Sequence, residues 1–469
     1  MSERIRVAAA IAAALLLGGC ANLIPPYQRP AAPVAASYPQ ETTPASVAGV
    51  PVAADIEWQR FFADPRLRRL IGIALQNNRD LRIAVLNIEQ ARAAYQVRRA
   101  DELPSVGAGA AVQRQPGSTG KLVNTYSVGL ALASYELDLF GRVRSLSQAA
   151  LAQYLATDEA RNAVQISLIS TLANTYMSQL ADDELLRVTR QTLVTREDSL
   201  KLTKLKFDYG AASELDYRQA ESLLESARAS LAQALRQRAL DEDALVLLAG
   251  QPLPADLPAP LALNAQQLST DLPAGLPSDL LERRPDIRSA EQQLISANAN
   301  IGAARAAFFP RISLTGNFGT ASTELSGLFK SGSFAFTGAG QLLQPLFDAG
   351  RNQANLEVAK VDRDIAVAQY ERAIQSAFRE VSDALAGRAT FGEQLRAQLA
   401  QAHAEEVRFK LSDLRYRNGA SSYLEVLDAQ RSLFAAQQAA VQVQAAQVQN
   451  LVTLYRVLGG GWKEPAPAQ

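Results

Sequence analysis

The chain has little of the chemistry that most enzymes use. Its 469 residues include one cysteine and one histidine. An intrachain disulfide is therefore excluded, and the single cysteine argues against a cysteine metal site. His403 is interpreted as a surface residue rather than a ligand, and the acidic pair Asp182-Asp183 as solvated rather than catalytic. The sequence contains no phosphate-binding loop, G-x-G-x-x-G run or nucleophile elbow. These absences argue against an enzyme.

Two further absences narrow the class of protein. After the N-terminal region, no run of 18 apolar residues could form a transmembrane helix. Lys plus Arg and Asp plus Glu both number 47, so no basic surplus would attract nucleic acid. Aromatic residues make up only 6% of the chain, while Ala, Leu, Gln and Arg are abundant. This composition is typical of long helices and coiled coils.

The N-terminus has the pattern of an export signal. Two arginines precede the short apolar run Val7 to Leu17, which ends in Leu-Gly-Gly-Cys20. This ending resembles a bacterial lipobox, so residues 1–19 are predicted to be a signal peptide and Cys20 the lipidated first residue. No cofactor other than this lipid is expected. The residue after Cys20 is Ala21. An Asp at this position would resemble an inner-membrane retention signal, so its absence favours the outer membrane. Residues 20–62, rich in Pro and Ala, are predicted to be a lipid-anchored linker and belt segment.

The chain repeats itself at an offset of about 209 residues, which lays Gly141 on Gly350 and Gly210 on Gly419. An internal repeat of this kind is the first feature that a prediction of the fold must explain. Repeat 1 is predicted over 63–250, repeat 2 over 278–458, with a Pro-rich linker at 251–277 and a tail at 459–469. Within them we expect helices, then strands, then long helices, at 64–102, 103–140 and 141–249 in repeat 1, and at 285–308, 309–349 and 350–458 in repeat 2.

Each repeat contains two stretches of about ten residues that alternate in character. One side is apolar and the other small or polar, as in Tyr126, Val128 and Leu130 against Ser127 and Gly129. This is the length and period of a tilted transmembrane β-strand. The alternative is a soluble sheet whose apolar face covers a core. The neighbouring helices have apolar seams that would pack on each other, which favours the membrane.

The long helices have few interruptions. No Pro or Gly occurs between Gly141 and Gly210, which predicts a rod of roughly 100 Å at 1.5 Å per residue. In the second repeat, Gly387 and Gly392 fall opposite Ala181 to Asp183, which suggests a loosened belt in both rods.

Four strands per chain cannot close a barrel, and open sheet edges do not occur in lipid. The predicted fold is therefore a mixed membrane α/β protein. Three chains would form a twelve-stranded β-barrel, continued by a periplasmic α-helical barrel with a mixed equatorial belt.

Several stretches resemble the TolC-like outer membrane factor family, in its lipoprotein branch. The most specific is Leu281 to Gly319; Leu414 to Phe434 and Leu454 to Trp462 also match. The resemblance covers essentially the whole mature chain. It implies a homotrimeric exit duct, to which a periplasmic adaptor and an inner-membrane pump of the RND type, usually proton-driven, would dock.

The resemblance also implies a gate at the periplasmic end. Leu424 would form an apolar constriction, Asp428 an acidic ring, and Tyr416 and Arg431 would hold the inner hairpin closed. The spacing of Leu424, Asp428 and Arg431 puts them on one helix face. The first repeat has Gln219 and Ser222 at the positions of Asp428 and Arg431, so the gate is expected on the second hairpin. The helix turns would contact the adaptor through Gly210, Ala211, Ser213, Gly419, Ala420 and Ser421.

Two other functions stay open. One is the outer membrane duct of a type I system that exports polypeptides. The other is a lipid-anchored coiled-coil scaffold without a pore, which would have no use for a lipid-facing sheet. The sequence indicates neither the cargo nor the cognate pump.

Overall fold

A computed structural model describes residues 22–39, 55–116, 120–266, 268, 272 and 279–462. Over these residues the chain divides into two compact units. Unit 1 comprises residues 22–31, 86–159 and 288–372, and unit 2 comprises residues 32–85, 160–287 and 373–462. The predicted signal peptide and Cys20 lie outside the described residues.

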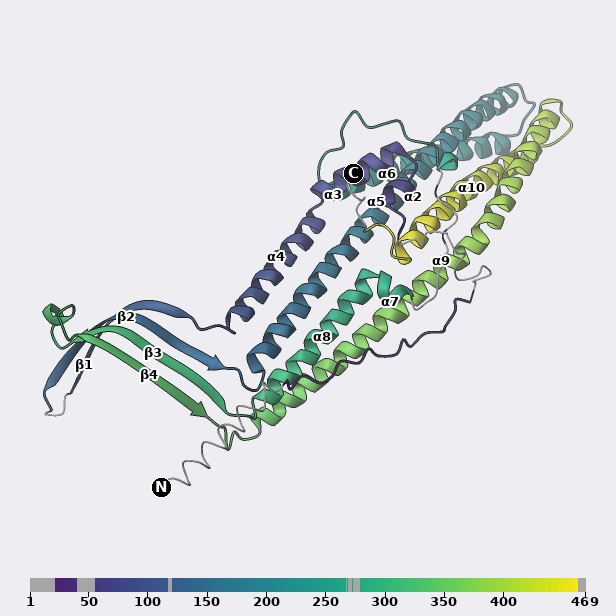
Figure 1. Ribbon diagram of the computed structural model, residues 1–469. Helices are drawn as coiled ribbons and strands as arrows, with labels where there is room; N and C mark the ends of the chain where they lie inside the picture. The colour runs from purple at the N-terminus through teal and green to yellow at the C-terminus, as the bar shows by residue number, and fades with distance from the viewer. Residues whose placement is uncertain are drawn as a thin grey trace, which may run out of the picture. The chain divides into compact units, whose positions relative to one another are not determined.

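Unit 1 contains a four-stranded antiparallel sheet in the order β1-β2-β3-β4 (Figure 1). All four expected strands are present, and they are β1 (Val106–Pro116), β2 (Leu122–Leu137), β3 (Arg311–Ser322) and β4 (Phe334–Leu343). The loop between β3 and β4 carries the short 3-10 helix η3 (Leu325–Gly327). Because the order is linear, β1 and β4 each leave one edge without a partner strand within the described chain.

The strand register gathers the large apolar side chains on one face of the sheet. Leu130 pairs with Phe318, which pairs with Phe336. Two residues along, Val128 pairs with Thr320, which pairs with Phe334. Side chains paired across neighbouring strands share a face. Phe318, Phe334 and Phe336 are 60%, 59% and 73% exposed. The face predicted from alternation is therefore present, and the described residues leave it uncovered.

The opposite face is built from small residues. Gly109, Gly129, Gly319 and Ala335 form one row across all four strands. A Cβ on Gly319 would lie 2.1 Å from the carbonyl oxygen of Val128, and one on Gly129 would lie 2.4 Å from that of Phe318. Since these contacts are with backbone, no side chain can be added at either position without separating β2 from β3.

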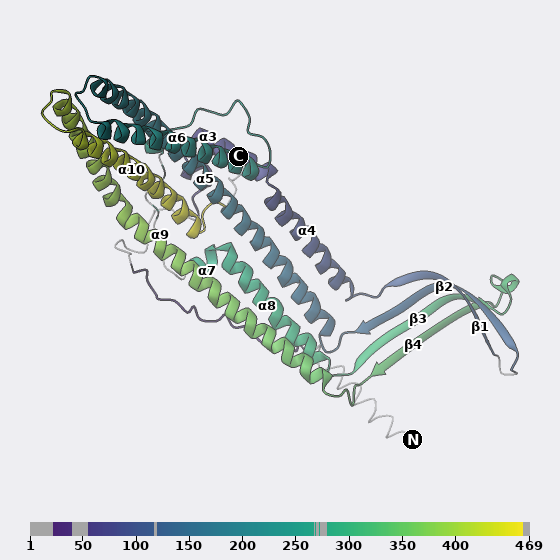
Figure 2. The same ribbon diagram turned by 180° about the vertical axis from the view of Figure 1, so that it is seen from behind.

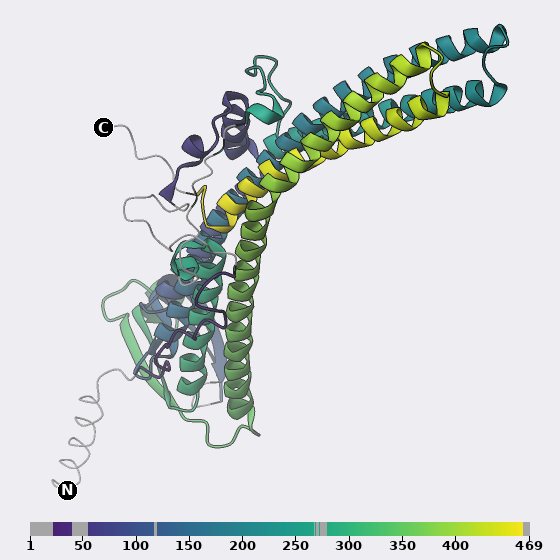
Figure 3. The same cartoon turned by 90° about the vertical axis from the view of Figure 1, so that its right-hand side faces the viewer.

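The long helices are α5 (Arg142–Asp208), α6 (Glu214–Ala249), α9 (Arg351–Arg417) and α10 (Tyr423–Val457). In unit 2, the later part of α5 forms a hairpin with α6, and that of α9 forms one with α10 (Figures 2 and 3). The expected loosening at Gly387 and Gly392 is wrong, because α9 continues through both. A Cβ on Gly387 would lie 2.4 Å from the side-chain oxygen of Asn450. Gly387 therefore serves close packing against α10.

The remaining helices are shorter: α2 (Trp58–Phe61), α3 (Pro65–Asn77), α4 (Arg79–Ala100), α7 (Asp279–Arg283), α8 (Pro285–Ala306) and the 3-10 helix η2 (Leu263–Ala265). None of the helices in the described ranges has both the length and the apolarity needed to cross a bilayer.

Asp64 organises the packing around α3 in unit 2. Its carboxylate caps the helix by accepting hydrogen bonds from the backbone N–H of Arg66 at 2.7 Å and of Leu67 at 3.3 Å. The other oxygen accepts from the Tyr176 hydroxyl at 2.9 Å and the Gln266 amide at 2.8 Å. Burial, followed by the Asp64 charge, raises the pKa of Tyr176. An N-cap aspartate before a first-turn proline thus also joins three distant segments.

In unit 1, residues 23–29 lie along one face of α8, and we name this segment the strap. The backbone oxygens of Leu23 and Pro25 accept hydrogen bonds from Arg305 at 3.1 Å and Asn298 at 2.8 Å. Farther along, Glu291 accepts two hydrogen bonds from Arg29, at 2.7 and 2.8 Å, and one from the Tyr27 hydroxyl at 3.0 Å. These α8 residues recur at helical spacing.

A pair of carboxyls faces each other between α5 and α6 in unit 2. One side-chain oxygen of Asp182 and one of Asp241 are buried, and neither accepts a hydrogen bond from a donor group. A proton shared between them would satisfy both. Burial, followed by the charge of Asp241, raises the pKa of Asp182 to about 7. The adjacent Asp183 is instead paired with Arg238 at 2.6 Å. Asp182 is thus not the simply solvated residue that the sequence suggested.

This pair makes stability depend on pH. The pKa of Asp182, raised in the folded state from 3.8 to about 7, means that the neutral form favours folding. The stabilisation is complete below pH 3.8 and is lost as pH rises through about 7. We expect the melting temperature of the wild type to fall between pH 5 and pH 8. Asp182→Asn should flatten this dependence and raise the melting temperature at pH 8 by roughly 2 °C or more.

Thermal unfolding followed by circular dichroism at both pH values measures the effect. Asp198→Asn, which alters an exposed carboxylate on the same helix, should keep the wild-type dependence. An unchanged pH dependence in Asp182→Asn would contradict the shared proton.

Candidate gate at the helix hairpins

The two hairpin turns have the same backbone geometry. Gly210 and Gly419 both have a φ of 72°, and the residue after each donates its N–H back to a carbonyl of the preceding helix, Ala211 to Lys206 at 2.7 Å and Ala420 to Arg415 at 2.8 Å. This is a Schellman-type helix end, which requires the left-handed conformation that glycine adopts. Both glycines and both alanines are exposed.

The next helices start differently. Ser213 and Asp216 form a capping box at the start of α6, whereas Ser422, at the start of α10, makes no side-chain capping bond. Ser213 is exposed and Ser421 is half-buried. All six turn residues singled out from the sequence therefore belong to two tight turns.

Leu424, Asp428 and Arg431 lie on one exposed face of α10, as their spacing predicts. Of the residues between them, Glu425 is also exposed, whereas Val426, Leu427, Ala429 and Gln430 are buried and point the other way. Leu424 is 59% exposed. Such an exposed leucine beside two charged residues is what a constriction formed with other copies of the chain would require.

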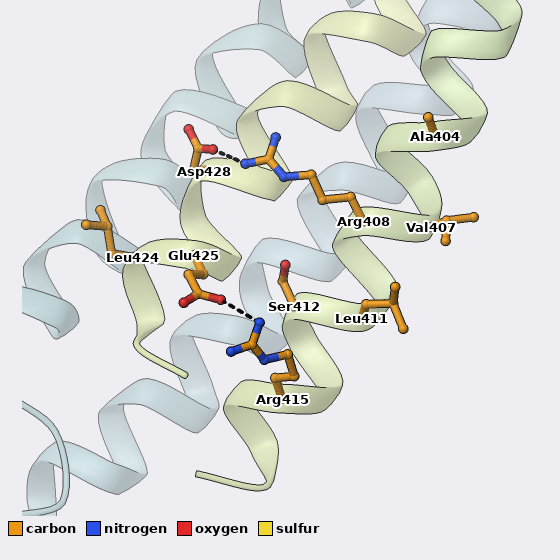
Figure 4. A pocket seen from close by; sticks show the side chains of 9 residues that line it. All are labelled: Ala404, Val407, Arg408, Leu411, Ser412, Arg415, Leu424, Glu425 and Asp428. Atoms are coloured by element: carbon orange, nitrogen blue, oxygen red, sulfur yellow. Dashed lines mark hydrogen bonds and ion pairs between the residues drawn. The ribbon is translucent and has the colours of Figure 1, made fainter. Parts of the chain in front are cut away.

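A groove of about 810 Å³ lies between α9 and α10 on this face (Figure 4). Arg408 of α9 reaches across it to Asp428, and it also pairs with Glu405 at 3.1 Å. Arg415 pairs with Glu425 at 3.6 Å in the same way. Exposed pairs of this kind stabilise by only about 0–1 kcal/mol each, so they can be exchanged easily. The groove also contains Ala404, Val407, Leu411, Ser412 and Leu424.

Sequence reasoning did not identify Arg408 or Arg415. The sequence shows Glu405 and Arg408 at a spacing suited to a pair within one helix, and this pair is present. It gives no sign that the arginine also crosses to α10. Only the packing of α9 against α10 brings Arg408 to Asp428.

Tyr416 is placed apart from the charged residues of the groove. It is buried in a cluster with Ala220, Leu223, Tyr423, Val426 and Leu427, in which both hairpins take part. Lys206 of the first hairpin lies over the Tyr416 ring, with its ammonium nitrogen 3.7 Å from the centroid, and contacts the Tyr416 carbonyl at 3.4 Å. Burial raises the pKa of the Tyr416 hydroxyl.

Few polar contacts join the two hairpins within the described residues. The Gln430 amide donates to the Ser199 hydroxyl at 2.8 Å, and the Gln449 amide donates to the Ser178 hydroxyl at 2.9 Å and to the Asn174 carbonyl at 3.2 Å. Lys206 meets Tyr416 as described. Arg431 has no ion pair with any described residue. The second hairpin is thus held to the first mainly by apolar packing. In the described part of the chain, no group of three or more His, Cys, Asp or Glu side chains could share a metal ion.

Comparisons with known proteins agree with this architecture. The chain is 48% identical to the antibiotic efflux pump outer membrane protein ArpC of Pseudomonas putida and to the toluene efflux pump outer membrane protein TtgC of the same species. Each match covers 96% of this chain and 94% of the relative.

A solved structure is also similar over almost the whole chain. The open state of the Neisseria gonorrhoeae MtrE outer membrane channel superposes with a TM-score of 0.86 at 44% identity, covering 94% of this chain and 99% of that one. The model of the family described as outer membrane efflux protein matches residues 70–251 and 276–460. With matches to both halves and this degree of identity, the chain belongs to the outer membrane efflux protein family.

Proposed function

We propose that this chain is the outer membrane channel of a tripartite efflux pump. It would conduct small molecules passively from an inner-membrane transporter and a periplasmic adaptor to the exterior. The observation that carries this function is the exposed apolar face of the sheet, with large side chains such as Phe318 and Phe336 turned outward. Such a face fits lipid.

The unpaired edges of β1 and β4 support a homotrimer. Three copies of the four-stranded sheet would join edge to edge and give a closed barrel of twelve strands, which leaves no edge exposed in the membrane. The long helices would continue it as a periplasmic α-helical barrel with an equatorial belt. A two-fold internal repeat is supported by the match of the family model to both halves of the chain.

The gate would lie on the second hairpin. Three copies of Leu424 around the axis would form an apolar constriction, with Asp428 and Arg431 beside it. The mainly apolar contact between hairpins supports an opening in which α9 and α10 move away from α5 and α6. The exposed turns at Gly210, Ala211 and Ser213 and at Gly419, Ala420 and Ser421 would receive the adaptor, because small residues allow its helices to approach closely.

The cargo would be chosen by the pump rather than by this component. The two relatives at the same identity carry the words antibiotic and toluene in their names. A passive duct requires no catalytic residues, and the family to which the chain belongs is described as outer membrane efflux protein. A type I secretion duct has the same architecture, but the names of the relatives favour efflux.

We also propose that Cys20 carries lipid. The strap begins three residues after it. Hydrogen bonds from Asn298 and Arg305 and to Glu291 hold the strap on α8, so the chain would be fixed close to its anchor. Intact-mass measurement of the protein purified from membranes should give a mass greater than that of residues 20–469 by the weight of a lipid group. An unmodified Cys20 in that spectrum would refute lipidation.

Charge placed on the apolar face of the sheet tests the barrel. Val128→Asp or Phe336→Asp should impair membrane assembly, since a charged side chain that faces lipid destabilises a barrel, by about 2–4 kcal/mol per chain for Arg or Lys at the membrane centre and by less for Asp. Ser127→Asp, on the opposite face, should be tolerated. Heat-stable trimers in outer membrane fractions are the readout, and normal trimers of Phe336→Asp would contradict a lipid-facing sheet.

Conductance in a planar bilayer tests the channel and its gate together. The wild type should show a small conductance, and Leu424→Gly/Asp428→Ala/Arg431→Ala should raise it several-fold by removing the constriction. The matched control is Leu215→Gly/Gln219→Ala/Ser222→Ala, which changes the equivalent positions of the first hairpin and should leave the conductance near that of the wild type.

The other outcomes are equally informative. Equal and large conductances of wild type and gate variant would support a channel but contradict a gate at Leu424, Asp428 and Arg431. No conductance from correctly trimeric protein would overturn the channel in favour of the scaffold.

A further inference from the structure

One arginine between the hairpins is buried without a counterion. Arg196 of α5 is 3% exposed. One terminal nitrogen donates to the carbonyl oxygen of Leu223 at 3.0 Å, and the guanidinium lies 5.2 Å from the centre of the Phe434 ring. Its Nε is buried and has no hydrogen-bond acceptor. None of the described residues offers Arg196 an acidic side chain at ion-pair distance.

The residues around Arg196 make burial of its positive charge less favourable. Burial, followed by the nearby positive charge of Arg431, lowers the pKa of Arg196. Buried charges in proteins are normally paired, because removing an ion from water is expensive unless an opposite charge compensates. A carbonyl oxygen and an aromatic ring compensate only in part. The site therefore lacks one negative charge.

A cavity adjoins this guanidinium. It has a volume of about 200 Å³, and its walls come from α5, α9 and α10. Phe409, Leu433 and Phe434 make its apolar part. Gln430, which is 5% exposed, also borders it, and the side-chain oxygen of Gln430 receives no hydrogen bond. Two buried polar groups that need partners thus meet at one cavity.

The acidic residue at the cavity wall does not supply the missing charge. Glu406 accepts a hydrogen bond from Lys410 at 2.6 Å, and this bond and the Lys410 charge lower the pKa of Glu406. The two wall residues of opposite charge therefore neutralise each other. What remains in the cavity is a single positive charge beside an apolar space.

We propose that this cavity binds a small organic carboxylate with a compact apolar body. The carboxylate would lie against Arg196, since a guanidinium matches a carboxylate in charge and planarity. The body would contact Phe409, Leu433 and Phe434. A single guanidinium suits one negative charge better than a phosphate dianion. The volume suits a ring of six carbons, because a cavity of about 150 Å³ can hold benzene.

Benzoate and its neutral analogue benzamide are the probes. Isothermal titration of the full-length protein in detergent micelles should show that benzoate binds the wild type at least about ten-fold more tightly than benzamide does. Arg196→Gln should reduce benzoate affinity to that of benzamide. Arg190→Gln, which removes an exposed arginine of the same helix, should leave it unchanged.

A second variant keeps the test valid if Arg196→Gln fails to fold. Leu433→Trp would fill the cavity and leave the arginine in place, so it should abolish benzoate binding. Benzoate should also raise the melting temperature of the wild type and not that of either cavity variant, because a ligand stabilises the state that binds it. Equal binding of benzoate and benzamide, or undiminished binding of benzoate to both cavity variants, would overturn the proposal.

Discussion

The sheet imposes the constraint on which the rest of the molecule depends. It exposes a large apolar face, and among the described residues its first and last strands each have one edge without a partner strand. Neither feature is stable in water, and free edges are not stable in lipid either. Only pairing with further strands removes the edges, and only lipid or another apolar surface covers the face. Close backbone contact at Gly129 and Gly319 fixes how β2 and β3 approach each other, so the sheet can meet this constraint only through partners beyond its own edges.

Much of this fold could be predicted because local sequence patterns determine its elements. Alternation identified the strands and their apolar face, the absence of Pro and Gly identified the 67-residue helix α5, and the internal repeat identified its counterpart α9. Gly210 and Gly419 marked the turns, since those turns need a positive φ. Gly387 misled the prediction, because a glycine that admits Asn450 looks the same in a sequence as one that loosens a helix.

The site was predicted less completely, and for a physical reason. Leu424, Asp428 and Arg431 share a face through spacing within one helix. The partners of these residues depend on how two helices cross. The contact of Arg408 with Asp428, and that of Lys206 with Tyr416, join residues from separate helices. Arg196 is the extreme case, since a buried and an exposed arginine on a long helix cannot be distinguished until the neighbouring helices are in place.

The strap has a consequence for the order of events during synthesis. Its partners on α8 follow it in the chain by 262 to 282 positions. A chain synthesised from its N-terminus therefore carries the strap without any α8 partner until Glu291 has emerged, and without the full set until Arg305 has emerged. The loop that must then close is long. Docking of the strap can come only after β1, β2, α5 and α6 have been made. Although the strap lies near the N-terminus, it can dock only after more than half of the chain has been synthesised.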